Sequence, residues 1–263
     1  YFHAWLVSNV LDSTYYYLEN TTNGDASLMN YRPYNKFMAA NMFTFTPIKH
    51  LSLSVGNSII YAEQTIQAAY LIPIAFYKSL DHLLTKGIRT QNQSVRPVDH
   101  LHLYGSFFVD EVKFKRFKPS YPEKNPISYL VGFNWSGWPI KGLSLKGEFM
   151  RSYIACYTHS IDVLTWTSNS YNMGHYMGDN AKSIYAELTY RPVRGLLLKM
   201  SYTNDTKYNS YAYQRDNIGK TISQKPFDHC IYRNDEFRFD GIFEAHPNMY
   251  LTLSVGYNHA RGF

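Results

Sequence analysis

Hydrophobic and polar residues alternate with a period of two along much of the chain, which is typical of a β-strand with two unlike faces. In the segment 143–149 the apolar residues fall on one side and the polar residues on the other: Leu143, Leu145 and Phe149 against Ser144, Lys146 and Glu148. The same alternation recurs in the segments 51–59, 101–110, 196–203 and 236–244. The pattern therefore predicts a series of β-strands, each with one apolar and one polar face.

A short motif precedes five of these strands. It consists of a proline and, a few residues later, Leu-x-Leu, and its copies begin at Pro47, Pro97, Pro139, Pro192 and Pro247. Proline fixes φ and lacks an amide donor, so it suits a turn better than a central strand. Each copy therefore predicts a short hairpin turn that leads into a new strand. Two copies also contain a glycine, Gly142 and Gly195, which supplies the positive φ that tight turns use.

The connections at the other ends of the hairpins are long and polar. They cover residues 11–33, 62–85, 114–126, 158–180 and 205–233. Short turns at one end and long loops at the other are typical of outer-membrane β-barrels. A charged set on one predicted strand also indicates a water-filled lumen, because a dry sandwich core could not solvate it: Glu236, Arg238, Asp240 and Glu244.

We therefore expect an all-β protein, a transmembrane antiparallel up-and-down β-barrel, with a soluble β-fold as the alternative. The segments add up to about eleven strands, an odd number where bacterial barrels favour even ones. If the proline turns are periplasmic, the last strand runs outward, whereas a complete barrel ends in the periplasm. Residues 1–263 are thus expected to form one barrel domain that is incomplete at one or both ends.

Composition agrees with this prediction. Aromatic residues make up 17% of the chain although its mean hydropathy is −0.36, and no apolar run reaches the roughly 18 to 20 residues that a membrane helix needs. The net charge of +6 does not favour a nucleic-acid partner, because the basic residues form no single stripe. Cys156 and Cys230 show no metal-ligand spacing, so we expect two thiols, a disulfide being the alternative, and neither metal nor cofactor.

Several segments resemble a known family. The residues that carry the resemblance lie in the segments 35–47, 51–61, 73–82, 103–111, 177–180 and 190–196, which read NKFMAANMFTFTP, LSLSVGNSIIY, PIAFYKSLDH, LYGSFFVDE, MGDN and YRPVRGL. They are similar to the capsule assembly Wzi-like outer-membrane proteins in the version widespread in the Bacteroidetes. That family normally has Asn before the proline of the third segment, where this chain has Ile72. The resemblance implies a barrel of about eighteen strands that helps to attach or organise surface polysaccharide as a lectin and not as an enzyme.

Two loop segments combine cations with aromatic rings. The candidate ligand-binding residues there are Lys115, Arg116, Lys118, Tyr208, Tyr211, Tyr213 and Arg215. Cations can hold acidic sugars or lipopolysaccharide phosphates, while flat rings offer platforms to sugar faces. The alternative for 113–118 is that its cations only neutralise lipid phosphates of the outer leaflet.

Four charged residues on the predicted polar faces form a second candidate set: Lys146, Glu148, Arg238 and Asp240. They could line a ligand groove or a polar pathway, or pair with neighbouring strands and stiffen the wall. His100 and His102 near Ser106 give only a weak hydrolase signal, because such triads are recognised by geometry. Apolar residues at helical spacing in 62–85 predict a segment that constricts the barrel mouth, caps an edge or packs against the wall.

The function expected from the sequence is non-enzymatic binding of surface or capsular polysaccharide in the bacterial outer membrane. The alternatives are a passive porin-like channel and a scaffold within a larger outer-membrane complex. The expected partners are outer-membrane lipid and lipopolysaccharide, surface polysaccharide and other outer-membrane proteins.

Overall fold

The fold was analysed in a computed structural model, which describes residues 1–19, 28–63, 65–72, 88–109, 114–118, 124–159, 161–209 and 226–262. Its elements follow one another along the chain as β1 (Phe2–Leu6), β2 (Leu11–Glu19), β3 (Leu28–Pro33), β4 (Lys36–Ile48), β5 (Leu51–Ala62), η1 (Ala68–Leu71), β6 (Ile88–Val98), β7 (Leu101–Val109), η2 (Phe114–Phe117), β8 (Ile127–Ser136), β9 (Leu143–Ser152), η3 (Asp162–Leu164), β10 (Thr167–Ser168), β11 (Tyr171–Asn172), β12 (Ala181–Tyr190), β13 (Leu196–Tyr208), β14 (Cys230–His246) and β15 (Met249–Arg261).

Eleven of these strands form one sheet in the order β1-β4-β5-β6-β7-β8-β9-β12-β13-β14-β15. From β4 onward, strands that follow one another in the sheet also follow one another along the chain, apart from the short pair β10 and β11. The registers from β7 to β15 are antiparallel throughout. The predicted all-β, antiparallel up-and-down arrangement is confirmed. In the described part of the chain the main sheet has the expected eleven strands, and four further strands lie outside it. β2 pairs with β3, and β10 with β11, in two separate sheets.

Four of the five proline turns, at residues 47–50, 97–100, 139–142 and 192–195, share one backbone conformation. The residue three positions after each proline has a positive φ: 78° at His50, 74° at His100, 79° at Gly142 and 83° at Gly195. Its carbonyl accepts a hydrogen bond from an amide near the end of a neighbouring strand, such as Arg191 N to Gly142 O at 2.9 Å and Glu244 N to Gly195 O at 2.8 Å. Each turn therefore extends the hydrogen-bonded ladder to the next hairpin.

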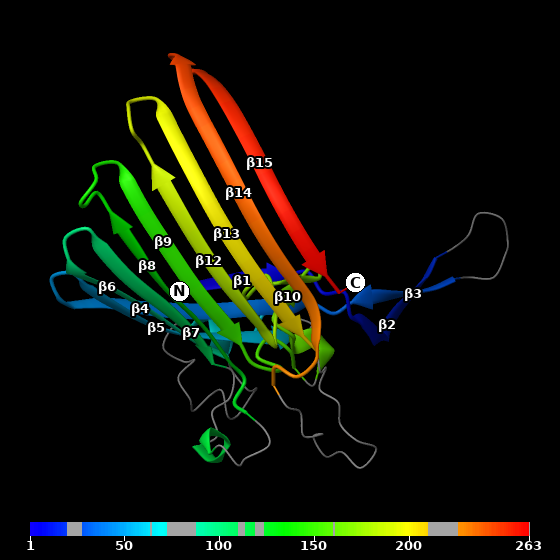
Figure 1. The fold of residues 1–263 in the computed structure, drawn as a ribbon. Helices are drawn as coiled ribbons and strands as arrows, with labels where there is room; N and C mark the ends of the chain where they lie inside the picture. The colour runs from blue at the N-terminus through cyan, green and yellow to red at the C-terminus, as the bar shows by residue number, and fades with distance from the viewer. Residues whose placement is uncertain are drawn as a thin grey trace. The chain divides into compact units, whose positions relative to one another are not determined.

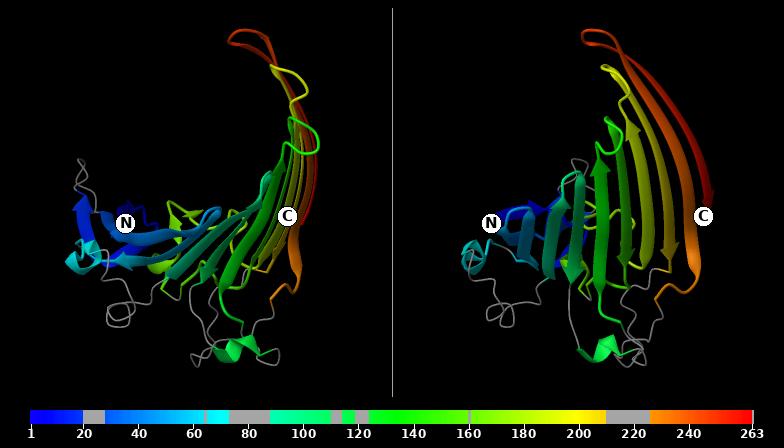
Figure 2. Two further views of the ribbon diagram at one scale, coloured as in Figure 1. Left: turned by 90° about the vertical axis from the view of Figure 1, so that its left-hand side faces the viewer. Right: turned by 60° about the vertical axis from the view of Figure 1, so that its left-hand side comes forward.

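The chain divides into two compact units. The first comprises Tyr1–Met42, Gly56–Arg89 and Tyr157–Tyr176, and the second comprises Phe43–Val55, Thr90–Cys156 and Met177–Phe263. All five hairpin turns lie in the second unit, in which β8, β9 and β12 to β15 run side by side (Figures 1 and 2). We call the hairpin side of these strands the turn end and the opposite side the loop end.

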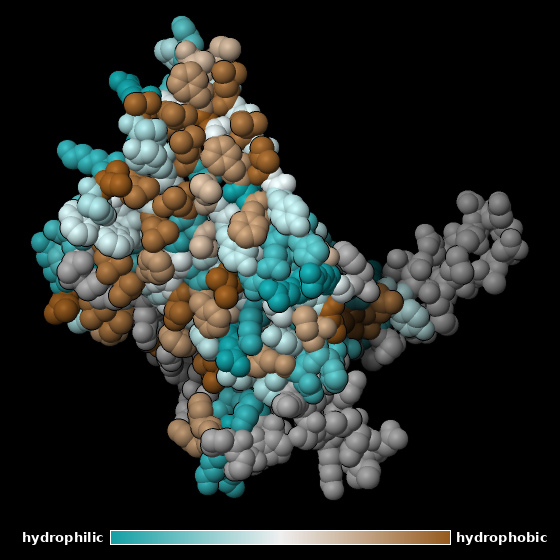
Figure 3. Space-filling model, viewed as in Figure 1, coloured by the Kyte–Doolittle hydropathy of each residue, from teal (hydrophilic) through white to brown (hydrophobic). Residues whose placement is uncertain are grey.

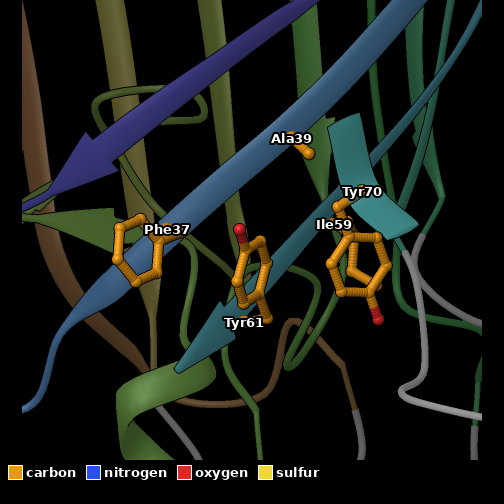
Figure 4. Close-up of a cluster of buried hydrophobic side chains, with 5 residues drawn as sticks. All are labelled: Phe37, Ala39, Ile59, Tyr61 and Tyr70. Atoms are coloured by element: carbon orange, nitrogen blue, oxygen red, sulfur yellow. The ribbon is translucent and has the colours of Figure 1, made fainter. Parts of the chain in front are cut away.

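The first unit contains a small buried core on β4, β5 and η1. Phe37, Ala39, Ile59, Tyr61 and Tyr70 make up this cluster (Figure 4). The Phe37 and Tyr61 rings are stacked with centroids 5.2 Å apart, and the Tyr70 ring lies 4.7 Å from that of Tyr61. Tyr70 of η1 thus packs against the strands, whereas Ile66, Leu71 and Ile72 are exposed, and the arrangement of the apolar segment 62–85 as a whole stays a prediction. Residues 73–85 lie outside the described residues.

A buried lysine holds a distant segment within the same unit. Lys36, at the start of β4, is 2% exposed, and its Nζ donates to the carbonyls of Thr165 and Thr167 at 2.7 Å each. A buried ammonium group needs such acceptors, since an unpaired charge in the interior is costly. Lys36 therefore fixes residues 165–167 against β4.

Two of the predicted long connections contain strand pairs of their own. The segment 11–33 includes the β2–β3 hairpin, and the segment 158–180 includes η3 and the short pair β10–β11. Their strands were missed because they lie between more strongly alternating segments. No disulfide joins Cys156, which is buried, to Cys230, which is exposed. Within the described ranges, no helix has the length and apolar character of a membrane span.

Candidate functional site

The strands β7 to β15 present an apolar face whose members are aligned by the strand registers. One row joins Trp135, Leu145, Leu188, Met200 and Phe239 across five neighbouring strands. Most of these side chains are exposed, Met200 by 57%. Hydrophobic side chains also cover much of the surface over β12 to β15 in the view of Figure 3. A continuous exposed apolar surface of this kind marks an interaction with lipid or with another apolar surface.

The opposite, polar face carries the four charged residues predicted from the sequence. Lys146 Nζ lies 2.9 Å from Glu148 Oε1 on β9, and the hydroxyl of Tyr104 on β7 donates to the same oxygen at 2.5 Å. Arg238 Nε lies 3.0 Å from Asp240 Oδ2 on β14, and Ser254 Oγ donates to Asp240 at 2.7 Å. Each predicted charge is thus paired within its own strand. Ser254 comes from the neighbouring strand β15, and Tyr104 from β7, which β8 separates from β9.

A third group on the polar face lies between these two. Lys199 Nζ on β13 is 2.7 Å from Glu187 Oε2 on β12, and the hydroxyls of Tyr185 and Thr189 also donate to Glu187. The Lys146 ammonium lies 5.4 Å from the centre of the Tyr185 ring, which links this group to the first. The strand register also places Asp240 directly across from Lys199, so the three groups form one band of tyrosines and paired charges along the polar face.

Tyr208 is the one member of the predicted tyrosine-rich loop set that the structure describes. It lies at the loop end of β13 with its ring edge-on to Phe227, at 5.4 Å between centroids. Tyr153 packs against Phe227 in the same way at 5.3 Å. Arg151 and Lys182 complete this group, which we call the Phe227 cluster. Tyr211, Tyr213 and Arg215 lie outside the described residues.

A buried asparagine positions the Phe227 cluster. Asn180 is fully buried and has a φ of 45°. Its side chain accepts a hydrogen bond from the Phe227 amide at 2.9 Å and donates one to the Asn209 carbonyl at 2.7 Å. Beside it, Asp179 pairs with Lys207 at 3.0 Å and accepts the Ala155 amide. The segment 177–180, which carries part of the family resemblance, therefore forms a structural corner at the loop end.

The basic segment 113–118 lies in the connection between β7 and β8. Lys115 and Arg116 fall within η2, and Lys118 follows it. Phe114 and Phe117 are exposed on either side of these cations. The structure thus places rings and cations together here, as the sequence indicates, but separately from the four charged residues of the polar face.

The histidines near Ser106 do not form a catalytic group with it. His100 Nδ1 is 2.8 Å from the carbonyl oxygen of Ser136, at the turn end. His102 and Ser106 are four residues apart on the extended strand β7, which corresponds to about 13 Å. Hydrogen bonding between a serine and a general base requires contact distances of about 3 Å.

Together, the antiparallel sheet, the short turns at one end and the two unlike faces define the fold class of an outer-membrane-type β-barrel. Among solved structures, the chain is similar to Wzi, described as an outer-membrane protein involved in group 1 capsule assembly in Escherichia coli and as a carbohydrate-binding β-barrel. The two share 14% sequence identity with a TM-score of 0.57.

The similarity covers 87% of this chain and 48% of the Wzi chain, so the chain spans about half the length of that structure. At this identity the likeness shows the fold alone. No family model and no curated protein matches the chain. The resemblance to Wzi-like proteins inferred from the sequence is thus supported at the level of the fold, and its Bacteroidetes type stays a prediction.

The alternation in 101–110 places Tyr104 on the polar face, but sequence reasoning did not select Tyr104, Tyr185 or Glu187 as site residues. Their signal was present, since each lies two residues from another polar-face residue or directly across from one. It also missed Arg151 and Lys182. These two are cross-strand partners in the register of β9 and β12, which becomes visible only when both hairpins are aligned.

Proposed function

We propose that the protein is an outer-membrane β-barrel that binds surface or capsular polysaccharide without acting on it enzymatically. The observation that carries this proposal is the polar face, on which Tyr104 and Tyr185 donate hydrogen bonds to carboxylates beside paired lysines. Tyrosine offers a flat apolar ring and a polar hydroxyl, and this combination suits the two faces of a sugar. In a closed barrel the polar face would line the lumen and the apolar face would contact lipid.

Three further features support the proposal. The exposed apolar face has the character of a lipid-facing surface. The fold is shared with a solved barrel that is described as carbohydrate binding. The exposed rings and cations of η2 provide a second place where an acidic sugar could be held.

The direct test is retention of native surface polysaccharide by the complete protein. We expect the protein to fractionate with the outer membrane and to bind polysaccharide prepared from the same cells, measured by glycan array or by co-purification. Localisation elsewhere would contradict the proposal, and so would free ion conduction by a purified protein that retains no polysaccharide.

A matched pair of tyrosine variants locates the binding surface. Tyr185→Leu removes a ring and a hydroxyl from the polar face, whereas Tyr257→Leu removes them from the apolar face. Loss of one stacking and hydrogen-bonding tyrosine should weaken polysaccharide binding about tenfold, which corresponds to about 1.4 kcal/mol. We expect this loss for Tyr185→Leu only. Equal binding by both variants would show that the polysaccharide does not bind at the polar face. The variant Lys115→Gln/Lys118→Gln would then test the segment at η2.

A passive channel is the second candidate, and the paired charges of the polar face favour it specifically, because charged lumen residues tune ion passage in barrels. Planar-bilayer recordings of the complete protein distinguish the two functions. A channel predicts steady conductance whose ion selectivity changes in Arg238→Gln, whereas a polysaccharide-binding barrel predicts that added polysaccharide is retained and reduces any current.

A further inference from the structure

Arg151 and Lys182 form a pair of like charges at the loop end of the sheet. They are direct cross-strand partners of the antiparallel strands β9 and β12. Side chains in such positions point to the same face with Cβ atoms about 5 Å apart, and like charges there repel each other. The pair therefore concentrates a charge of +2 at one point on the loop end of the sheet.

No carboxylate compensates this charge among the residues that the structure describes. The ion pairs nearest in the strand register belong to other cations: Arg233 with Asp235 and Lys207 with Asp179. The Nε atom of Arg151 is buried and has no hydrogen-bond partner within the described ranges. Because Nε is buried, an oxyanion would be bound by the terminal guanidinium nitrogens of this partly exposed side chain, which suit a bidentate contact with phosphate.

The aromatic rings of the Phe227 cluster hold both cations in place. The Arg151 guanidinium lies 4.0 Å and the Lys182 ammonium 4.9 Å from the centre of the Phe227 ring. Tyr153 and Tyr208 each contact one of the cations, at 5.2 and 5.3 Å. Such cation–π contacts orient a cation without neutralising it. The pair is thus preorganised and still positively charged.

The position of the pair on the sheet indicates what it meets. On β9, Arg151 lies two residues nearer the loop end than Phe149, and on β12 Lys182 lies two residues nearer it than Ile184. Phe149 and Ile184 are cross-strand partners on the apolar face. Arg151 and Lys182 therefore point to the same side as the apolar face, immediately past its last apolar residues and toward the loop end. The same cross-strand row continues to Arg233 and Arg261.

We infer that Arg151 and Lys182 form a binding site for the phosphate groups of an outer-leaflet lipid. This inference rests on the proposed function in one respect, because it takes the apolar face as lipid-facing and the loop end as external. On a barrel so placed, a cation pair just beyond the apolar band lies at the level of the lipid headgroups, where basic residues bind phosphate. Polysaccharide bound on the polar face would lie on the other side of the sheet.

The test compares lipid A species bound to the complete protein in native mass spectrometry. Protein in detergent is mixed with diphosphorylated lipid A or with enzymatically dephosphorylated lipid A. We expect wild-type protein to retain the diphosphorylated form, and Arg151→Gln/Lys182→Gln to retain about tenfold less, as expected when charge-assisted bonds to phosphate are lost.

The matched control is Arg191→Gln/Arg194→Gln. It removes the same charge from an exposed turn at the opposite end, where β12 leads into β13. We expect this variant to bind lipid A like the wild type. Lys182→Arg keeps the charge and should keep the binding. A heat-modifiable band on electrophoresis verifies that each variant is folded.

Three results would overturn the inference: equal retention by Arg151→Gln/Lys182→Gln and wild type, equal retention of the dephosphorylated lipid by the wild type, or an equal loss in the control variant. A loss of acidic polysaccharide binding with unchanged lipid A binding in the site variant would also overturn it, in favour of a glycan site. If the wild type retains lipid A but no polysaccharide, the proposed function fails while the lipid site stands.

Discussion

Four turn residues share a positive φ, although two are glycine and two are histidine. Gly142 is the most constrained of them, because a Cβ atom at this position would lie 2.4 Å from the Arg191 carbonyl oxygen. At His50 and His100 the same backbone conformation accommodates a full side chain. The proline motif thus predicts the turn, whereas the space beside the turn decides which side chain it tolerates.

Gly142→Ala is therefore expected to destabilise the protein. The left-handed conformation costs a non-glycine residue about 1 to 2 kcal/mol, and the clash with the Arg191 carbonyl adds to this. Urea unfolding of the complete protein in lipid vesicles measures the change. His50→Gly is the control, and its stability should change by less than about 1 kcal/mol, because relief of strain offsets the added freedom of the unfolded chain. An unchanged unfolding midpoint for Gly142→Ala would show that the turn can shift.

At the scale of the element, the alternation read from the sequence assigns each strand residue to a face, and the registers confirm this assignment for β7 to β15. Met200 and Ser201 show the contrast well, since they are neighbours on β13 with opposite orientations. Met200 aligns with Leu188 on the apolar face, and Ser201 aligns with Glu187 on the polar face.

This contrast predicts different outcomes for the same substitution. Met200→Arg places a charge on the proposed lipid-facing side, which costs about 2 to 4 kcal/mol near the bilayer midplane. Ser201→Arg places it beside Glu187 on the polar face and should be tolerated. The yield of folded protein in the outer-membrane fraction checks this. If Ser201→Arg were the more harmful of the two, the two faces would be assigned the wrong way round.

At the scale of the whole molecule, segments far apart in the chain are joined by contacts that no local pattern encodes. Lys36 reaches the carbonyls of Thr165 and Thr167, about 130 positions later. Asn180 similarly connects the backbone at Phe227 with that at Asn209. In each case one polar side chain satisfies two distant backbone groups.

Lys36→Met tests this kind of contact in the first unit. The substitution keeps the apolar stem but leaves two carbonyls without their buried donor, so we expect a loss of about 2 to 4 kcal/mol in local stability. Hydrogen exchange of the amides at 166–173 should become faster. Lys49→Met, in the exposed turn after β4, serves as the control and should leave this exchange unchanged. Unchanged exchange in Lys36→Met would mean that other contacts hold the segment.

The sequence by itself determined the class of fold, the number of strands in the main sheet, the positions of the proline turns and the two unlike faces. It could do so because strand alternation and turn chemistry are local properties of the chain. It also placed the four charged residues on the polar face, but it did not show the contacts that Tyr104, Tyr185 and Glu187 make there.

Only the tertiary structure decided which residues meet across strands and at the loop end. The pairing of Arg151 with Lys182, the rings around Phe227 and the buried bonds of Lys36 and Asn180 all depend on strand register and on how connections fold back. The buried bonds of Lys36 and Asn180 join residues from 29 to 131 positions apart. A period of two determines the face to which a side chain points, but not which residue lies next to it on the adjacent strand. That neighbour depends on the strand register, so only the folded chain shows which residues form the sites.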